Sequence, residues 1–187
     1  MMFELKLNTF RHELQSMNVG YLMVFVLFLI GLTLYLYKQF STPLLFGIDG
    51  PYYYIQVHNL LVNGQLKYAD PPLAFYILGL FSIIFNNIIA GIKFGSTIVV
   101  LATIFPLYLL VKELTKSSLH GILAIVLYVF SSFLVRMSFD LIKNAMGLLF
   151  LTSFMLFYVL MLKTGRKVYM LLSILMLVLT GLTHILD

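Results

Sequence analysis

The chain has 187 residues, of which 61% are hydrophobic and only 10% are charged, and its mean hydropathy is +1.02. A soluble domain carries about 25% charged residues, so this composition excludes a soluble globular protein. The absence of cysteine excludes disulfides and thiolate chemistry, and the net charge of +5 lies in short loops, where it indicates membrane orientation rather than nucleic-acid binding.

Long apolar segments run through the whole chain. A helix needs about 20 apolar residues to cross a hydrocarbon core about 30 Å thick. The segments that approach this length are residues 19–37, 72–92, 94–111, 119–135, 145–162 and 168–186. The first is too long for a secretory signal and no small-x-small cleavage site follows it, so we interpret it as an uncleaved membrane helix. The sequence therefore predicts an all-α integral membrane protein, built as a multi-span helical bundle.

The one long connection, residues 38–70, follows the first apolar segment and is too rich in apolar and aromatic residues to be disordered. Asp49-Gly50-Pro51 is typical of a helix start, because Asp49 can cap the helix and Pro51 fits its first turn. Asn63-Gly64 is typical of a helix end. We expect a short amphipathic helix on the membrane surface, whose apolar face consists of Tyr52, Ile55, Leu60 and Leu61.

Residues 72–92 pose a question of topology. Gly79, Ser82, Asn86 and Ala90 form a small or polar stripe at helical spacing, and Lys93 alone separates this segment from the next. We interpret the segment as an interfacial or re-entrant helix, which leaves about five transmembrane helices. The alternative is an ordinary membrane helix with a small-residue packing face, which gives six. The distribution of Lys and Arg fits five crossings with the N-terminus inside and six with the N-terminus outside equally well.

The number of crossings decides whether the polar residues can share a site. Five crossings place Asp49, Asp70, Asp140, Lys143 and His184 on one side of the membrane. Six crossings place Asp49 and Asp140 on opposite sides. A shared side is a precondition for a shared site.

Asp49 is the first candidate for chemistry. A carboxylate just beyond a membrane helix can take a proton from an acceptor hydroxyl or hold a divalent cation, and the same side chain can simply cap a helix. The residues alone leave these alternatives open. In the tyrosine cluster that follows, the ring of Tyr53 can stack on a sugar, although interfacial aromatic residues are also common membrane anchors.

A second group of polar residues lies between two later apolar segments. Asp140, Lys143 and Asn144 have the spacing of one helical face, so Lys143 and Asn144 can bind a phosphate or a sugar hydroxyl. The alternative is a local ion pair between Asp140 and Lys143 at the membrane edge. His184, at the end of the last apolar segment, can donate a hydrogen bond to a phosphate or serve as an interfacial residue.

These motifs together resemble the membrane glycosyltransferases of the C type (GT-C), which include protein O-mannosyltransferases, the catalytic subunit of oligosaccharyltransferase and lipid A aminoarabinose transferases. Asp49 lies in Ile48-Asp49-Gly50-Pro51-Tyr52-Tyr53, which is similar to the acidic motif that follows the first membrane helix of that superfamily. Pro71-Pro72-Leu73 is similar to the start of its juxtamembrane helix. Asp140 matches a second acidic motif, and His184 matches a later histidine.

The resemblance implies a hexosyltransferase that moves a sugar from a polyprenyl-phosphate carrier in the membrane to an extracytoplasmic acceptor. It implies that Asp49 acts as general base or metal ligand and that Asp140 is the second acidic site. Lys143, Asn144 and His184 would contact the carrier phosphate. The expected location is a prokaryotic plasma membrane, with the site facing outside, and nucleic acid is not an expected partner.

The sequence also departs from the superfamily. Asp140 stands alone, without the Asp-x-Asp or Asp-x-Glu pair of the oligosaccharyltransferase branch, so a requirement for Mg²⁺ or Mn²⁺ is left open.

We expect a single transmembrane domain over 1–187, with a first membrane helix at 19–37, an external loop at 38–93 and further helices at 94–187. Such a short chain is expected to be the N-terminal portion of a longer enzyme, or a homologue that needs a second chain. The alternative functions are a small transporter or lipid flippase, and a non-catalytic assembly subunit.

Overall fold

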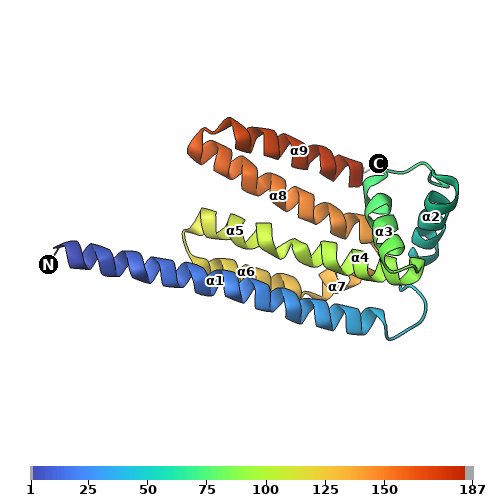
Figure 1. Ribbon diagram of the computed structural model, residues 1–187, viewed down its shortest axis with the longest axis horizontal. Helices are drawn as coiled ribbons and strands as arrows, with labels where there is room; N and C mark the ends of the chain where they lie inside the picture. Colours follow the sequence, from blue (N-terminus) through green and yellow to red (C-terminus); the bar gives the residue numbers. More distant parts are fainter. Residues whose placement is uncertain (1, 184–187) are drawn as a thin grey trace.

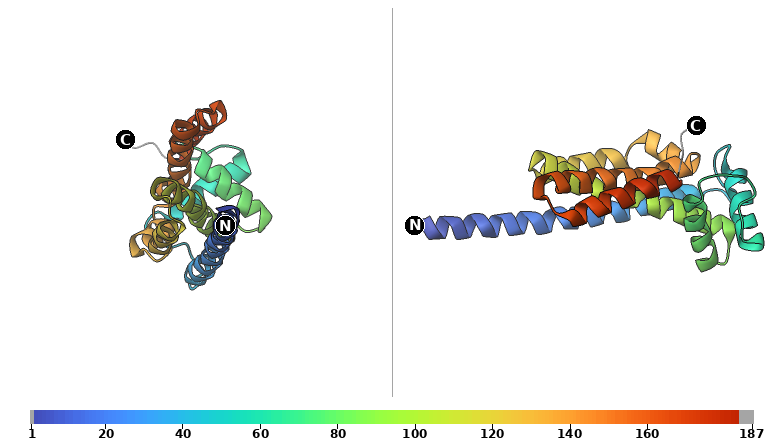
Figure 2. Two further views of the ribbon diagram at one scale, coloured as in Figure 1. Left: turned by 90° about the vertical axis from the view of Figure 1, so that its left-hand side faces the viewer. Right: turned by 90° about the horizontal axis from the view of Figure 1, so that it is seen from above.

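The structure is a computed structural model that describes the backbone of residues 2–183 and the side chains of residues 19–183. In this part the chain is entirely helical (Figure 1). The helices are α1 Met2–Gln39, α2 Gly50–Asn63, α3 Leu73–Ile84, α4 Ile88–Ala102, α5 Ile104–Thr115, α6 Ser118–Val129, α7 Ser132–Phe139, α8 Ile142–Thr164 and α9 Lys167–Thr183. The longer helices run lengthwise through a bundle, and α2 and α3 lie at one end of it (Figure 2).

Three stretches are long and apolar enough to cross a membrane: Val19–Gln39, Ile88–Thr115 and Ile142–Thr164. Helices α6 and α7 form a fourth span if the pair, bent by 54°, crosses as one. Apolar side chains such as Leu22, Leu127 and Leu171 are exposed along the bundle, where a bilayer would cover them. The chain is therefore a multi-pass membrane protein.

The structure supports part of the expected set of about five spans. Length and composition support three or four within the described residues. The expected segment 119–135 is not one straight helix, because α6 ends at Val129 and α7 begins at Ser132. The expected segment 168–186 corresponds to α9, which packs along α8 but has only 17 residues in the described part. A fifth span therefore stays a prediction.

Residues 72–92 do not form one helix. Helix α3 has 12 residues and is about 18 Å long, too short for a hydrocarbon core about 30 Å thick. The chain turns at Asn86, which has a positive φ of 47°, and the side chain of Asn87 then caps α4 by accepting a hydrogen bond from the Ala90 N–H at 2.9 Å. A Cβ at Gly91 would overlap the Ser82 backbone, so the small residues of this segment pack α3 against α4. The alternative in which the whole segment crosses as a single helix is wrong.

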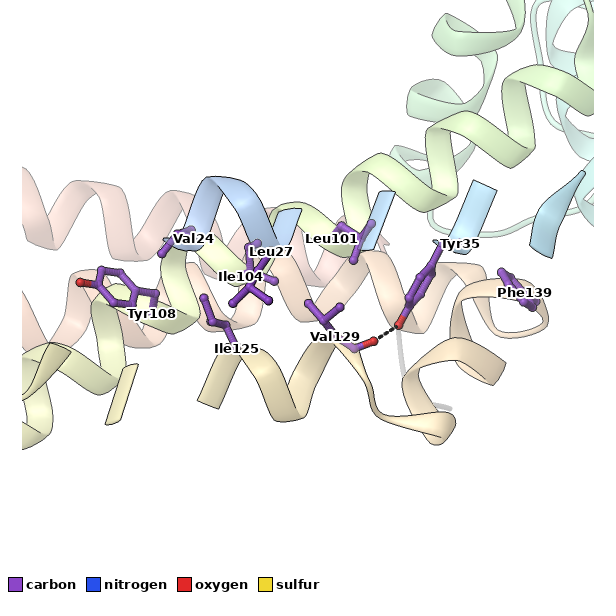
Figure 3. Packing of buried hydrophobic residues seen from close by; sticks show 9 residues of the cluster. All are labelled: Val24, Leu27, Tyr35, Leu101, Ile104, Tyr108, Ile125, Val129 and Phe139. Atoms are coloured by element: carbon purple, nitrogen blue, oxygen red, sulfur yellow. Dashed lines mark hydrogen bonds between the residues drawn. The ribbon is translucent and has the colours of Figure 1, made fainter. Parts of the chain in front are cut away.

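Three apolar clusters hold the bundle together, of which the third is small and consists of Val100, Leu134 and Ala145. The first lies between α1, α5 and α6 and extends to Leu101 of α4 and Phe139 of α7 (Figure 3). In it the Tyr35 hydroxyl donates a hydrogen bond to the Val129 carbonyl at 3.0 Å, at the end of α6. The second lies where α2 and α3 meet α4 and α8. Its fully buried members include Tyr53, Val57, Phe75, Leu78, Ile92 and Met146. This second cluster fixes α2 and α3 against the end of the bundle, where the polar residues gather.

Candidate functional site

The polar residues singled out in the sequence meet at the end of the bundle that carries α2 and α3. Asp49 ends the loop between α1 and α2, and Asp70 lies in the connection between α2 and α3. Asp140 and Lys143 lie on either side of the α7–α8 junction, which reaches the same end (Figures 1 and 2). His184 lies outside the described residues.

Asp140 holds the loop that precedes α2. Its Oδ1 accepts hydrogen bonds from the backbone N–H groups of Ile48, at 2.9 Å, and Asp49, at 3.3 Å. Gly47 has a φ of +81°, and a Cβ there would overlap the Asp140 carboxylate. The loop therefore approaches Asp140 so closely that it needs a glycine in the left-handed region.

The prediction that Asp140, Lys143 and Asn144 share one helical face is wrong. Helix α7 ends at Phe139 and α8 begins at Ile142, so the helix is interrupted between Asp140 and Lys143. Asp140 is the residue after the end of α7, and Lys143 and Asn144 lie in the first turn of α8. Asn144 is half-buried beside Lys143.

Asp49 occupies the N-cap position of α2 but makes no capping hydrogen bond with its side chain. The helix start was predicted correctly, whereas capping by the Asp49 carboxylate was not, because Asp49 has αR backbone dihedrals rather than the extended ones typical of a capping residue. Asp49 is half-buried, and within the described residues its carboxylate has no hydrogen-bond or ion-pair partner. An acidic side chain fixed through its backbone and unused by the fold is available to a ligand.

Lys143 pairs with Asp70, and the local ion pair with Asp140 that we considered does not form. The Lys143 Nζ lies 2.5 Å from the Asp70 Oδ2, and the two side chains are only 16% and 11% exposed. The hydroxyl of Tyr52 donates to the same Asp70 oxygen. The Lys143 ammonium also lies over the rings of Tyr52 and Phe75, at 5.5 and 5.9 Å from their centres. Sequence reasoning gave Asp70 no role, although an acidic residue directly before the helix-breaking Pro71-Pro72 could have indicated a functional position.

Gln56 is a second residue that sequence reasoning missed. It is fully buried, and its Oε1 accepts hydrogen bonds from the backbone N–H groups of Lys67, at 2.8 Å, and Tyr68, at 3.0 Å. Its Nε2 donates to the Tyr68 carbonyl and to the Tyr52 hydroxyl, both at 3.1 Å. All polar atoms of the amide are thus satisfied, and the connection that carries Asp70 is fastened to α2. The hydropathy pattern cannot distinguish a buried glutamine from an exposed one on such a helix, so the role of Gln56 was not predictable.

Of the two tyrosines of the site, Tyr53 is buried and Tyr52 is half-buried, and both are protonated. Burial, and then the hydrogen bond with Asp70, raise the pKa of Tyr52 to about 12. Burial also raises the pKa of Tyr53 above its ordinary range. Tyr53 is only 1% exposed, and its hydroxyl accepts a hydrogen bond from the Lys143 N–H at 3.3 Å. In this arrangement the ring of Tyr53 positions α8 and leaves no open face for a sugar, whereas the neighbouring Tyr54 is exposed.

An apolar pocket of about 400 Å³ is lined by Gly50, the residue after Asp49, although Asp49 itself does not line it. It lies between the loop before α2, the first turns of α2 and the start of α4, and it is lined by Leu44, Leu45, Gly47, Gly50, Pro51, Tyr54, Ile55 and Ile89. In the part of the chain that the structure describes, no group of three or more histidine or acidic residues is placed to hold a metal ion. The site thus combines a free carboxylate, an apolar pocket and a lysine held by an acidic partner.

Comparison with known proteins identifies the family. Residues 69–184, more than half of the chain, match the family model for dolichyl-phosphate-mannose-protein mannosyltransferase. The chain belongs to this family. The resemblance to membrane glycosyltransferases of the C type is thereby confirmed, and membership of the mannosyltransferase family implies a glycosyltransferase that uses a lipid-linked sugar. No curated protein and no solved structure matches the chain.

The match to the mannosyltransferase family covers α3 to α9 and therefore includes Asp70, Asp140 and Lys143. It begins after Asp49. The role of Asp49 thus rests on its position in the fold, beside Asp140.

Proposed function

We propose that this chain is a membrane glycosyltransferase that moves a sugar from a polyprenyl-phosphate carrier to an acceptor hydroxyl at the end of the bundle that carries α2 and α3. The observation that carries the proposal is the half-buried Asp49 carboxylate. It has no partner among the described residues and lies next to an apolar pocket, while Asp140 fixes its backbone. The family match supports the lipid-linked donor.

Asp49 acts as the general base. It takes the proton of the acceptor hydroxyl as that oxygen forms a bond to the anomeric carbon of the sugar. The bond between the anomeric carbon and the phosphate oxygen breaks, and the carrier phosphate leaves with the electron pair. Atoms and charge balance without a redox partner, and the step needs a single carboxylate.

Asp140 acts through the loop rather than on the reacting atoms. Its Oδ1 is occupied by the N–H groups of Ile48 and Asp49, so its role is to hold the general base in place. Lys143 and Asn144, at the start of α8, are proposed to contact the carrier phosphate. The charge of Lys143 is shared with Asp70, which fixes the ammonium and reduces its net attraction for an anion. His184 is proposed as a further phosphate contact.

The test uses the purified chain in liposomes, supplied with radiolabelled polyprenyl-phosphate mannose and a peptide that contains serine and threonine. A general base contributes about 10²- to 10⁴-fold to the rate, so we expect Asp49→Asn to lower the transfer rate at least 100-fold. The matched control is Glu113→Gln, which makes the same chemical change at the opposite end of the bundle, where Glu113 pairs with Lys116. We expect it to keep the wild-type rate.

Transfer by Asp49→Asn at the wild-type rate would refute the role of Asp49 as general base. A wild-type chain that transfers no sugar from this donor would refute mannose transfer from polyprenyl phosphate. A transporter or lipid flippase would be expected to cross the membrane with residues 72–92, whereas α3 ends at Ile84. No observation at this end of the bundle favours transport.

A further inference from the structure

Lys93 is a buried cation without an acidic partner in the part of the chain that the structure describes. It is 1% exposed, and none of the ion pairs there includes it. Its Nζ donates a hydrogen bond to the Thr42 carbonyl at 2.6 Å and lies 5.0 Å from the centre of the Phe40 ring. A carbonyl and an aromatic ring offset only part of the cost of removing an ammonium group from water. The remaining donors of the ammonium can bind an anion.

A pocket of about 480 Å³ lies beside this ammonium group. Both groups that contact the ammonium, Thr42 and Phe40, line the pocket together with Lys93 itself, so the charge borders the pocket. Its lining residues are Phe40, Ser41, Thr42, Pro43, Asn87, Ile89, Ala90 and Lys93, and none of them is acidic. The Thr42 hydroxyl and the amide nitrogen of Asn87 are further donors among the lining residues.

The start of α4 adds to the positive potential of this pocket. Ile89 and Ala90 belong to the first turn of α4, where the unpaired N–H groups of a helix and its dipole favour an anion. The Asn87 side chain satisfies the Ala90 N–H, which leaves earlier N–H groups of the turn without a helical partner. A buried cation and a helix N-terminus therefore face the same space.

The length of the span that carries Lys93 places this residue near the boundary between hydrocarbon and headgroups. The span Ile88–Thr115 has 28 residues and is about 42 Å long, so it exceeds a hydrocarbon core of about 30 Å by about 6 Å at each end. Lys93 lies five residues after Ile88, about 8 Å along the helix, and is thus close to the boundary between hydrocarbon and headgroups. The apolar pocket beside Asp49 shares Ile89 with this one, so an apolar chain can continue from the phosphate position.

We propose that Lys93, Thr42 and the start of α4 form a binding site for the phosphate group of a membrane lipid. The lipid is either a bilayer phospholipid or a polyprenyl phosphate, which share this chemistry. The phosphate neutralises Lys93, and the lipid chain extends along the neighbouring apolar pocket, which Ile89 also lines. This binding site is separate from the proposed transfer reaction. Its test measures lipid binding and not sugar transfer, so the proposal can hold even if the transfer reaction does not.

The test is native mass spectrometry of the purified chain in a non-ionic detergent, with lipids added one at a time. The probes are dioleoyl phosphatidylglycerol, undecaprenyl phosphate, inorganic phosphate and dioleoylglycerol, which has the same chains as the first but no phosphate. We expect at least one phosphate-bearing lipid to bind at least ten-fold more tightly than dioleoylglycerol. Binding of both lipids assigns the site to membrane phosphates in general, and binding of undecaprenyl phosphate alone assigns it to the carrier.

Variants locate the binding at Lys93. We expect Lys93→Met to weaken lipid binding at least ten-fold, Lys93→Arg to retain it, and Lys67→Met, which removes an exposed charge at the same end, to leave it unchanged. A second measurement uses only the wild-type chain and so does not depend on the folding of a variant. We expect a phosphate-bearing lipid to raise the melting temperature, measured by circular dichroism, more than dioleoylglycerol does. Equal binding by Lys93→Met, equal binding of dioleoylglycerol, or binding of inorganic phosphate with neither lipid would each overturn the proposal.

Discussion

At the scale of single residues, Asp140 acts on a loop that lies far away in the sequence. Two backbone N–H groups of that loop donate to its Oδ1, and Gly47 lets the backbone approach it. Asp49 is left with a carboxylate that the fold does not use. The helix motif at Asp49 was visible in the sequence, but the freedom of its side chain depends on Asp140.

Replacement of Gly47 by alanine tests this contact. The left-handed conformation costs a non-glycine residue about 1–2 kcal/mol, and the new methyl group would also overlap the Asp140 carboxylate. We expect Gly47→Ala to lower the free energy of unfolding by more than about 2 kcal/mol and the transfer rate at least ten-fold. Gly165→Ala is the matched control, because Gly165 also has a positive φ but no atom near the position of a Cβ. Unfolding in detergent, followed by circular dichroism, measures both, and equal effects would contradict the role of the contact.

At the scale of elements, the connection between α2 and α3 is fixed from two sides. Gln56 binds its backbone to α2, and Asp70 ties it to Lys143 on α8. The buried face of α2 consists of Tyr53, Gln56 and Val57, whereas Ile55 and Leu61 of the predicted apolar face are exposed. The bounds of α2 were predictable because its turn residues encode them locally. Its buried face was not, because α3 and α8 decide which side of the helix they cover.

The ion pair between Asp70 and Lys143 is expected to matter for stability. Removal of one partner from a largely buried pair leaves an uncompensated charge, and such changes cost about 3–5 kcal/mol. We expect Asp70→Asn to lower the free energy of unfolding by about 3 kcal/mol. Glu113→Gln, which affects two more exposed pairs, with Lys116 and Lys163, should lower it by less than about 1 kcal/mol. The double variant Asp70→Asn/Lys143→Met should recover most of the loss. A loss for Asp70→Asn no larger than that for Glu113→Gln would show that the pair does not stabilise the fold.

At the scale of the whole molecule, α3 is the element that decides the topology. It is too short to cross a bilayer and turns back into α4 at Asn86, so the α2–α3 connection and the α3–α4 turn lie at the same end of the bundle. The connection between α8 and α9 lies at the opposite end (Figure 1).

Single cysteines test this topology on a chain that naturally has none. Lys67→Cys and Asn86→Cys place a thiol in the α2–α3 connection and in the α3–α4 turn, and Arg166→Cys places one between α8 and α9. In sealed vesicles we expect a membrane-impermeant maleimide to label the first two from the same side and the third only from the other. Labelling of Asn86→Cys from the side of Arg166→Cys would mean that α3 crosses the membrane.

The sequence by itself determined the class of protein, the family and most helix positions. Membrane helices are encoded by continuous apolar length, and helix ends such as Gly64, which has a φ of 72°, by residues with special backbone preferences. Both signals are local. The tertiary structure alone decided that Lys143 pairs with Asp70, 73 residues away, that the helix breaks after Phe139 without glycine or proline, and that Lys93 has no acidic partner in the described part. Charged and polar groups in a membrane protein take whichever partner the packing brings within reach, and that depends on all the helices at once.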